Sequence, residues 1–236
     1  LHLLSSCASG RITRMLIGDI CGIGPLYAEI SAELRDLMKK NVNAIQQQRI
    51  VRDISKRLEK AARRGAYASL LISTYFAPNR SFRLCNTGHP PPFVYRRRTQ
   101  EWSLLKPTDP PPLLPIDEAL DDVVSLDEYQ QLETRLEVGD MVLSMSNLLT
   151  ECRNADGNIL GLSGVLQEVA ELDAEQPEEL LPSLLDKLST MNDENDRASE
   201  ATLLLCRATG TRVGLKDNVL APFRLLGKVS DNTKLD

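Results

Sequence analysis

The sequence predicts an α+β fold in which antiparallel sheets carry helices on their outer sides. One reason is the order of elements: a strand, two helices, several strands joined as hairpins, two more helices and a last strand. A parallel sheet would instead require strands and helices to alternate regularly. A second reason is composition, because 42% apolar and 26% charged residues over 236 residues are ordinary for a globular chain with one core of normal size.

The first part of the chain predicts one strand followed by two helices. Residues 12–17 are rich in β-forming side chains and end at Gly18 and Asp19, where we expect a tight turn. Apolar residues then recur at helical spacing over residues 26–38 and 50–62. We expect the apolar stripes of both helices to share one sheet surface.

The rest of the chain predicts a meander of short strands and then two helices. We expect the strands at residues 67–76, 81–86, 93–95, 102–105, 132–136, 141–145 and 202–206. The helices are expected at residues 162–171 and 178–189, followed by an acidic loop over 192–200. We assign residues 1–207 to one domain, with residues 208–236 as a C-terminal extension that lacks strong periodicity.

Charge and cysteine usage exclude several functional classes. The 28 basic and 33 acidic residues give a net charge of 28 − 33 = −5, which argues against a nucleic-acid partner. We interpret the short basic run at residues 96–98 as a solvated hairpin edge. No apolar stretch is long enough to span a membrane, so no membrane partner is expected. The five scattered cysteines and two histidines offer no zinc motif and suggest reduced thiols in the cytoplasm.

Three glycine-containing segments hold the candidate functional residues. The first reads GDICGIG over residues 18–24, and by itself it fits a structural turn as well as a cation site built on Asp19. The second reads NTGHPPP over residues 86–92. The third begins with Gly139 and Asp140 and ends in TECRNADG over residues 150–157.

Together the three segments resemble the motifs of the PPM-type protein phosphatases, in the bacterial branch typified by SpoIIE and RsbU. The likeness covers about residues 11–207 and implies an α-β-β-α sandwich of two antiparallel sheets flanked by helices. It also implies two Mn²⁺ or Mg²⁺ ions that activate a water for attack on phosphoserine or phosphothreonine. The implied substrate is a phosphoprotein, such as a regulator of the anti-anti-sigma type.

The resemblance assigns roles to particular residues. Asp19 matches the family's bridging aspartate, which makes it the candidate catalytic residue and a metal ligand, and the Ile20 carbonyl matches a backbone ligand. Asn147 stands where the family has an aspartate, and Ser199-Glu200 stands for an aspartate pair. Glu200 could still reach a metal ion. A further family aspartate would lie about one residue before Leu1.

Several of these residues also have a purely structural interpretation. His89 could act as a general acid, or it could fix the end of a strand by hydrogen bonding. Glu151 and Arg153 could contact the substrate, or they could form a structural pair. The acidic loop contains carboxylates that could replace lost metal ligands or could simply be solvated, namely Asp193, Glu194 and Asp196.

The sequence leaves two functions open. A third alternative is a structural domain that has no functional site. The chain could be an active metal-dependent serine/threonine phosphatase. It could also be a catalytically impaired pseudophosphatase that serves as a regulatory binding module, because Asn147 and Ser199 fall where the chemistry would take place. Since the chain starts just past the family's first strand, we expect an unpaired edge at residues 12–17, which would allow a homodimer.

Overall fold

The computed structural model describes residues 1–7, 11–21, 26–41, 50, 51, 54, 67–105 and 131–210. The chain divides into two compact units. The first unit comprises Leu1–His89, Pro107–Leu136 and Gly210–Asp236, and the second comprises Pro90–Lys106 and Glu137–Thr209. Each unit is built on one antiparallel sheet.

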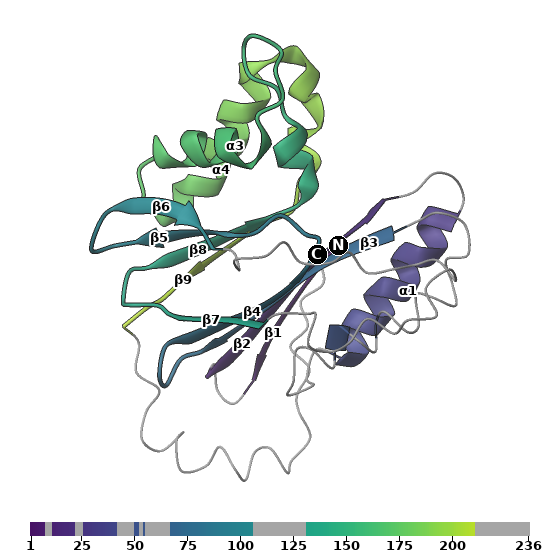
Figure 1. The fold of residues 1–236 in the computed structure, drawn as a ribbon, viewed down its shortest axis with the longest axis vertical. Helices are drawn as coiled ribbons and strands as arrows, with labels where there is room; N and C mark the ends of the chain where they lie inside the picture. Colours follow the sequence, from purple (N-terminus) through teal and green to yellow (C-terminus); the bar gives the residue numbers. More distant parts are fainter. Residues whose placement is uncertain are drawn as a thin grey trace. The chain divides into compact units, whose positions relative to one another are not determined.

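The sheet of the first unit has five strands in the order β1-β2-β3-β4-β7 (Figure 1). These strands are β1 (His2–Cys7), β2 (Ile12–Cys21), β3 (Tyr67–Phe76), β4 (Ser81–Thr87) and β7 (Gln131–Arg135). Each neighbouring pair is antiparallel. The hairpin predicted at residues 67–86 is therefore present.

Helix α1 (Leu26–Asn41) covers part of one face of this sheet (Figure 1). Successive strand side chains point to opposite faces, so Leu16 of β2 and its partner Ile72 of β3 face the same way. Both pack in one core with Leu34 of α1, and all three are fully buried. Of the predicted helix at residues 50–62, only residues 50, 51 and 54 are described; they are helical and buried in the same core.

The unpaired edge expected at residues 12–17 is wrong. Strand β1 pairs with β2 along this whole stretch, from His2 opposite Ile17 to Cys7 opposite Ile12. The homodimer inferred from that edge therefore loses its basis. The turn expected at Gly18 and Asp19 is also wrong, because β2 continues through both residues to Cys21.

Gly18 has a packing role instead of a turning role. A Cβ atom at this position would lie 3.2 Å from Leu34 Cδ2 of α1 and 3.4 Å from Leu70 Cδ1 of β3. The glycine therefore lets the helix approach the strand closely. As a result, Asp19 lies inside a paired strand rather than in a loop.

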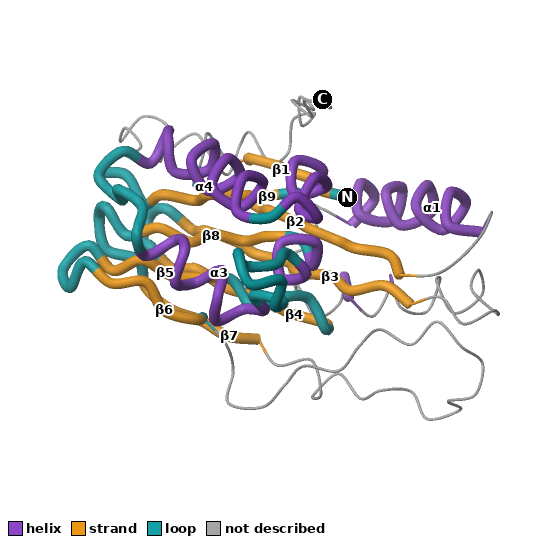
Figure 2. Tube along the Cα trace, turned by 90° about the horizontal axis from the view of Figure 1, so that it is seen from above, coloured by secondary structure: helices purple, strands orange, loops and turns teal. Residues whose placement is uncertain are grey.

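The sheet of the second unit has four strands in the order β6-β5-β8-β9. They are β5 (Phe93–Arg96), β6 (Glu101–Leu104), β8 (Met141–Met145) and β9 (Leu203–Arg207). Helices α3 (Gly161–Ala170) and α4 (Pro177–Met191) lie on one face of it (Figure 2). Their buried residues Val165, Leu184 and Leu188 share a core with Phe93 and Leu143 of the sheet.

Two 3-10 helices complete the second unit. Helix η2 (Asn147–Glu151) follows β8, and η3 (Asp193–Glu200) lies between α4 and β9. The segment expected as an acidic loop is thus helical for most of its length. The predicted fold class, two antiparallel sheets with flanking helices, is confirmed. No helix among the described residues is long and apolar enough to cross a membrane.

Candidate functional site

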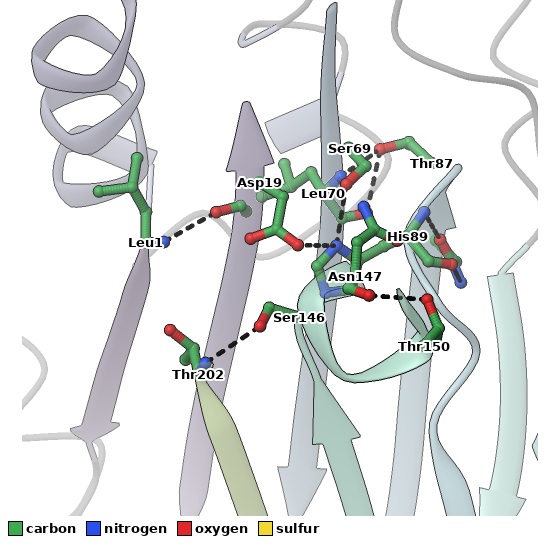
Figure 3. Close-up of polar contacts among 12 residues, drawn as sticks. Leu1, Asp19, Ser69, Leu70, Thr87, His89, Ser146, Asn147, Thr150 and Thr202 are labelled. Carbon is green, nitrogen blue, oxygen red and sulfur yellow. Dashed lines mark hydrogen bonds and ion pairs between the residues drawn. The ribbon is translucent and has the colours of Figure 1, made fainter. Parts of the chain in front are cut away.

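Asp19 lies on β2 directly opposite Ser69 of β3 (Figure 3). Its carboxylate Oδ2 is 3.9 Å from Nδ1 of His89, which is too long for a hydrogen bond but close enough for a charge interaction when the ring is protonated. The same Nδ1 lies 3.0 Å from the Ser69 hydroxyl oxygen. The side chain of His89 is fully buried, whereas that of Asp19 is 19% exposed.

A closed turn holds His89 in place. Its backbone N–H donates to Asn86 Oδ1 over 2.9 Å, and Asn86 Nδ2 donates back to the His89 carbonyl oxygen over 2.8 Å. Gly88, between them, has a φ of 69°, which only glycine adopts without strain. These contacts support the structural interpretation of His89 as the residue that fixes the chain after β4.

Thr87 extends the pairing of β3 and β4 with its side chain. Its hydroxyl donates to the Leu70 carbonyl oxygen and accepts from the Leu70 N–H, each over 3.0 Å. Thr87 is completely buried. The second motif therefore forms a rigid frame at the end of β4, beside Asp19 of β2.

In the second unit, Asn147 begins helix η2, and only Ser146 separates it from β8. Its carbonyl oxygen accepts a 2.7 Å hydrogen bond from the Thr150 hydroxyl, which closes the first turn of the helix (Figure 3). The preceding Ser146 bonds twice to Thr202. The Ser146 N–H donates to the Thr202 carbonyl oxygen over 2.9 Å, and the Thr202 N–H donates to Ser146 Oγ over 3.0 Å.

Glu200 ends helix η3 rather than lying on a strand. Its Oε2 accepts from Nε and Nη2 of Arg197 at 3.2 and 3.1 Å, and both side chains are mostly exposed. The pairing of Glu151 with Arg153 proposed from the sequence is not what the structure shows. Arg153 pairs instead with Glu194, with Nε 2.7 Å from Oε2.

Asn195 joins the third motif to η3 and was not singled out from the sequence. It is only 3% exposed. Its Oδ1 accepts from the Arg153 N–H, and its Nδ2 donates to the carbonyl oxygens of Arg153 and Leu188, each over 2.8 Å. No sequence signal marks this residue, because its two bonds to Arg153 join segments 42 residues apart.

Asp140, the acidic residue of the third motif, is a structural residue. It is 2% exposed and accepts hydrogen bonds from the Arg96 guanidinium and from the backbone N–H groups of Arg97 and Glu137. These side-chain bonds serve the turns that flank β5 and β8. Of the basic run at residues 96–98, Arg97 and Arg98 are exposed, as predicted.

The structure places the candidate metal ligands that the sequence predicts in both units. Asp19 and Ile20 are neighbours on β2 of the first unit, and Asn147 and Glu200 belong to the second unit, where Ser146 and Thr202 join their segments. Hard divalent cations prefer several oxygen ligands, mostly carboxylates. Among the described residues, no three His, Cys, Asp or Glu side chains come together in a way that could hold a metal ion. The described donor set does not fit a two-cation centre.

Solved structures share this fold. This chain matches the structure of the RsbU and RsbW domains of Rv1364c from Mycobacterium tuberculosis with 16% identity and a TM-score of 0.66. The match covers 95% of this chain and 64% of that structure's chain. The PP2C phosphatase domain of SpoIIE from Bacillus subtilis, with a fragment of its regulatory domain, matches at 17% identity and a TM-score of 0.66, over 88% of this chain and 57% of the other. RsbX in complex with magnesium matches at 14% identity and a TM-score of 0.57, over 87% and 84%.

The chain spans less than two thirds of the first two of these structures. A search of the curated proteins finds no match. The model of the family described as Stage II sporulation protein E (SpoIIE) matches residues 9–209, which is most of the chain. The chain therefore belongs to the SpoIIE family, with the fold of the PPM-type phosphatases.

Proposed function

We propose that this chain is a signalling domain that recognises a phosphorylated protein, of the anti-anti-sigma type of regulator. Family membership supports the proposal, because the family is one of protein phosphatases and signalling proteins. The observation that carries it is the intact frame of both motif loops. Asn86 and His89 close the loop after β4, and Ser146 and Thr202 join the segments that hold Asn147 and Glu200.

Such a frame supports recognition of a phosphorylated partner whether or not the bond to phosphate is cleaved. Buried hydrogen bonds hold loops in one conformation, so a partner that binds there pays little ordering entropy. Asp19, Ile20, Asn147 and Glu200 remain the proposed site residues. The described cysteines Cys85, Cys152 and Cys206 are free thiols, which supports a reducing, cytoplasmic setting for the partner.

Calorimetric titration with a purified anti-anti-sigma-type regulator tests this proposal. The full-length protein should be titrated with the regulator in its phosphorylated form, in its unphosphorylated form and with its phosphorylated serine changed to alanine. We expect the phosphorylated form to bind at least about tenfold more tightly than either of the others. Equal binding of all three forms, or binding of none, contradicts the proposal.

A further inference from the structure

The carboxylates that remain at the motif positions lie beside cationic or potentially cationic groups of the protein. Glu200 accepts both of its described hydrogen bonds from the guanidinium of Arg197. Asp19 has the buried imidazole of His89 3.9 Å from its Oδ2. Each of the two motif carboxylates therefore already has a basic side chain next to it.

The charge at the four motif positions is too small for a pair of divalent cations. Asp19 and Glu200 each contribute −1, and Asn147 and Ser199 contribute none, so the four sum to −2. The further family aspartate expected before Leu1 would bring this sum only to −3. Two Mn²⁺ or Mg²⁺ ions would bring +4. Such ions give up their water only when several anionic oxygens replace it, and Mg²⁺ does so most reluctantly. Neutral amide and hydroxyl oxygens compensate poorly for this loss.

The acidic residues of helix η3 do not make up the difference. Glu194 is paired with Arg153 through a 2.7 Å contact. Asp193 and Asp196 are exposed on the surface of the helix. Among the described residues, neither they nor Glu200 joins a cluster of three metal-binding side chains.

The backbone around the altered positions is nevertheless fixed by hydrogen bonds. The two Ser146–Thr202 hydrogen bonds fix the residue before Asn147 and a residue just after Glu200. Asn195 ties η3 to Arg153 in the same unit. These segments therefore lack anionic ligands at Asn147 and Ser199, while hydrogen bonds hold the backbone that presents both positions.

From these observations we infer that the domain holds its phosphorylated partner without hydrolysing the phosphoester, so that it preserves the phosphorylated state. The identity of the ligand rests on the proposed function, whereas the lack of a metal-driven hydrolysis rests on the donor set alone. A domain of this kind would compete with active phosphatases for the same phosphoprotein. Its effect on signalling would depend on the fraction of the phosphoprotein that it binds, and not on a rate of phosphate hydrolysis.

Restoring the missing charges provides the test. The full-length protein and the double variant Asn147→Asp/Ser199→Asp should be titrated with Mn²⁺ by calorimetry and assayed for hydrolysis of para-nitrophenyl phosphate. We expect no measurable Mn²⁺ binding below millimolar concentration and no turnover for the unchanged protein. The double variant should bind Mn²⁺ at least about tenfold more tightly, because it places two anionic ligands on segments that hydrogen bonds already hold in position.

A matched control separates ligand geometry from overall charge. The double variant Ser163→Asp/Ser183→Asp adds the same two charges at exposed positions of α3 and α4, away from the motifs. It should bind Mn²⁺ no better than the unchanged protein. Equal improvement in both double variants would overturn the inference, because general charge would then explain the binding. Failure of Asn147→Asp/Ser199→Asp to gain Mn²⁺ affinity would overturn it too.

The decisive result against the inference is activity of the unchanged protein. Mn²⁺-dependent turnover, or loss of phosphate from the bound regulator, that disappears in Asp19→Ala would show a working site. The regulator titration keeps the two proposals apart. If the phosphorylated regulator does not bind, the proposed function fails, while the metal titrations still decide whether the site can hold its cations.

Discussion

Ser146 and Thr202 are joined by two hydrogen bonds, although they are 56 residues apart in the chain. The Ser146 hydroxyl oxygen accepts from the Thr202 N–H, and the Ser146 N–H donates to the Thr202 carbonyl oxygen. Ser146 lies between β8 and η2, whereas Thr202 lies between η3 and β9. The backbone N–H and the hydroxyl of one serine thus tie together the two segments of the second unit that carry Asn147 and Glu200.

The first prediction concerns this serine. Replacement of Ser146 by Ala leaves the Thr202 N–H without its side-chain acceptor at a site where Ser146 is only 6% exposed. We expect a loss of about 1–2 kcal/mol in the free energy of unfolding, measured by urea denaturation. The exposed Ser163 of α3 provides the control, and Ser163→Ala should change stability by less than about 0.5 kcal/mol. Equal effects of the two changes would contradict the role given to Ser146.

The second prediction concerns Asn195, the buried residue between the third motif and η3. Asn195→Ala removes three hydrogen bonds and leaves backbone groups of Arg153 and Leu188 without these partners. We expect a loss of about 2–4 kcal/mol in urea denaturation, clearly more than for Ser146→Ala. The neighbouring exposed change Asp196→Asn should cost much less. A loss below about 1 kcal/mol for Asn195→Ala would show that the network is not cooperative.

The third prediction compares a buried and an exposed carboxylate that bind the same β5–β6 hairpin. Asp140 is 2% exposed and accepts three hydrogen bonds, whereas Glu175 pairs with Arg97 and both side chains are 46% exposed. Asp140→Asn should lower the free energy of unfolding by about 2–3 kcal/mol, because a charged acceptor is lost inside the protein. Glu175→Gln should cost less than about 1 kcal/mol, as exposed pairs usually do.

Raising the salt concentration separates the two cases further. Added NaCl should shrink the small effect of Glu175→Gln because solvent ions screen an exposed pair, and it should leave the effect of Asp140→Asn largely unchanged. If both effects fall together, Asp140 is more accessible to solvent than its burial indicates.

Strands with a strong apolar pattern could be predicted from the sequence almost to the residue. The run at residues 141–145 was expected as a buried strand, and all five residues of β8 are buried. The hairpin around residues 67–86 carried both alternation and turn residues. Periodicity is visible in the sequence whenever one face of an element packs against a core.

Strand β1 was missed because its pattern is too short and too weak. Exposure alternates along residues 1–6, but Leu3 and Leu4 are identical residues at 5% and 47% exposed, and Ser5 and Ser6 follow, so the sequence itself shows no apolar alternation. The turn predicted at Gly18 is wrong for a different reason. A glycine in a strand can mark a turn or a close approach, and only the position of Leu34 decides between them.

The ligands of the candidate site and their ion pairs could be predicted only in part. The loss of carboxylates at residues 147 and 199 can be read directly from the sequence. The pairing of Glu200 with Arg197 could not, because it depends on helical geometry in a segment that has no apolar periodicity. The two bonds between Asn195 and Arg153 also join distant segments, and local sequence patterns carry no information about them.

The fourth prediction concerns alkaline pH. Burial raises the pKa of the Cys85 thiol to about 12 and that of Cys206 to about 11, from an ordinary value of 9.0. In the unfolded chain both thiols ionise near their ordinary pKa, whereas in the folded protein they stay protonated. The folded state therefore holds more protons between about pH 9 and pH 12, and its stability falls as the pH rises through this window. Below pH 9 the two thiols cause no pH dependence.

The change Cys85→Ala isolates this contribution. At neutral pH it should lower stability by creating a small cavity, since Cys85 is completely buried among Leu16, Ile72 and their neighbours. Its free energy of unfolding should nevertheless fall less steeply between pH 9 and pH 11 than that of the unchanged protein. Cys206→Ala should flatten the same slope by a smaller amount, because its pKa is raised less. Parallel slopes for all three proteins would mean that the unfolded chain keeps these thiols as well shielded from water as the folded protein does.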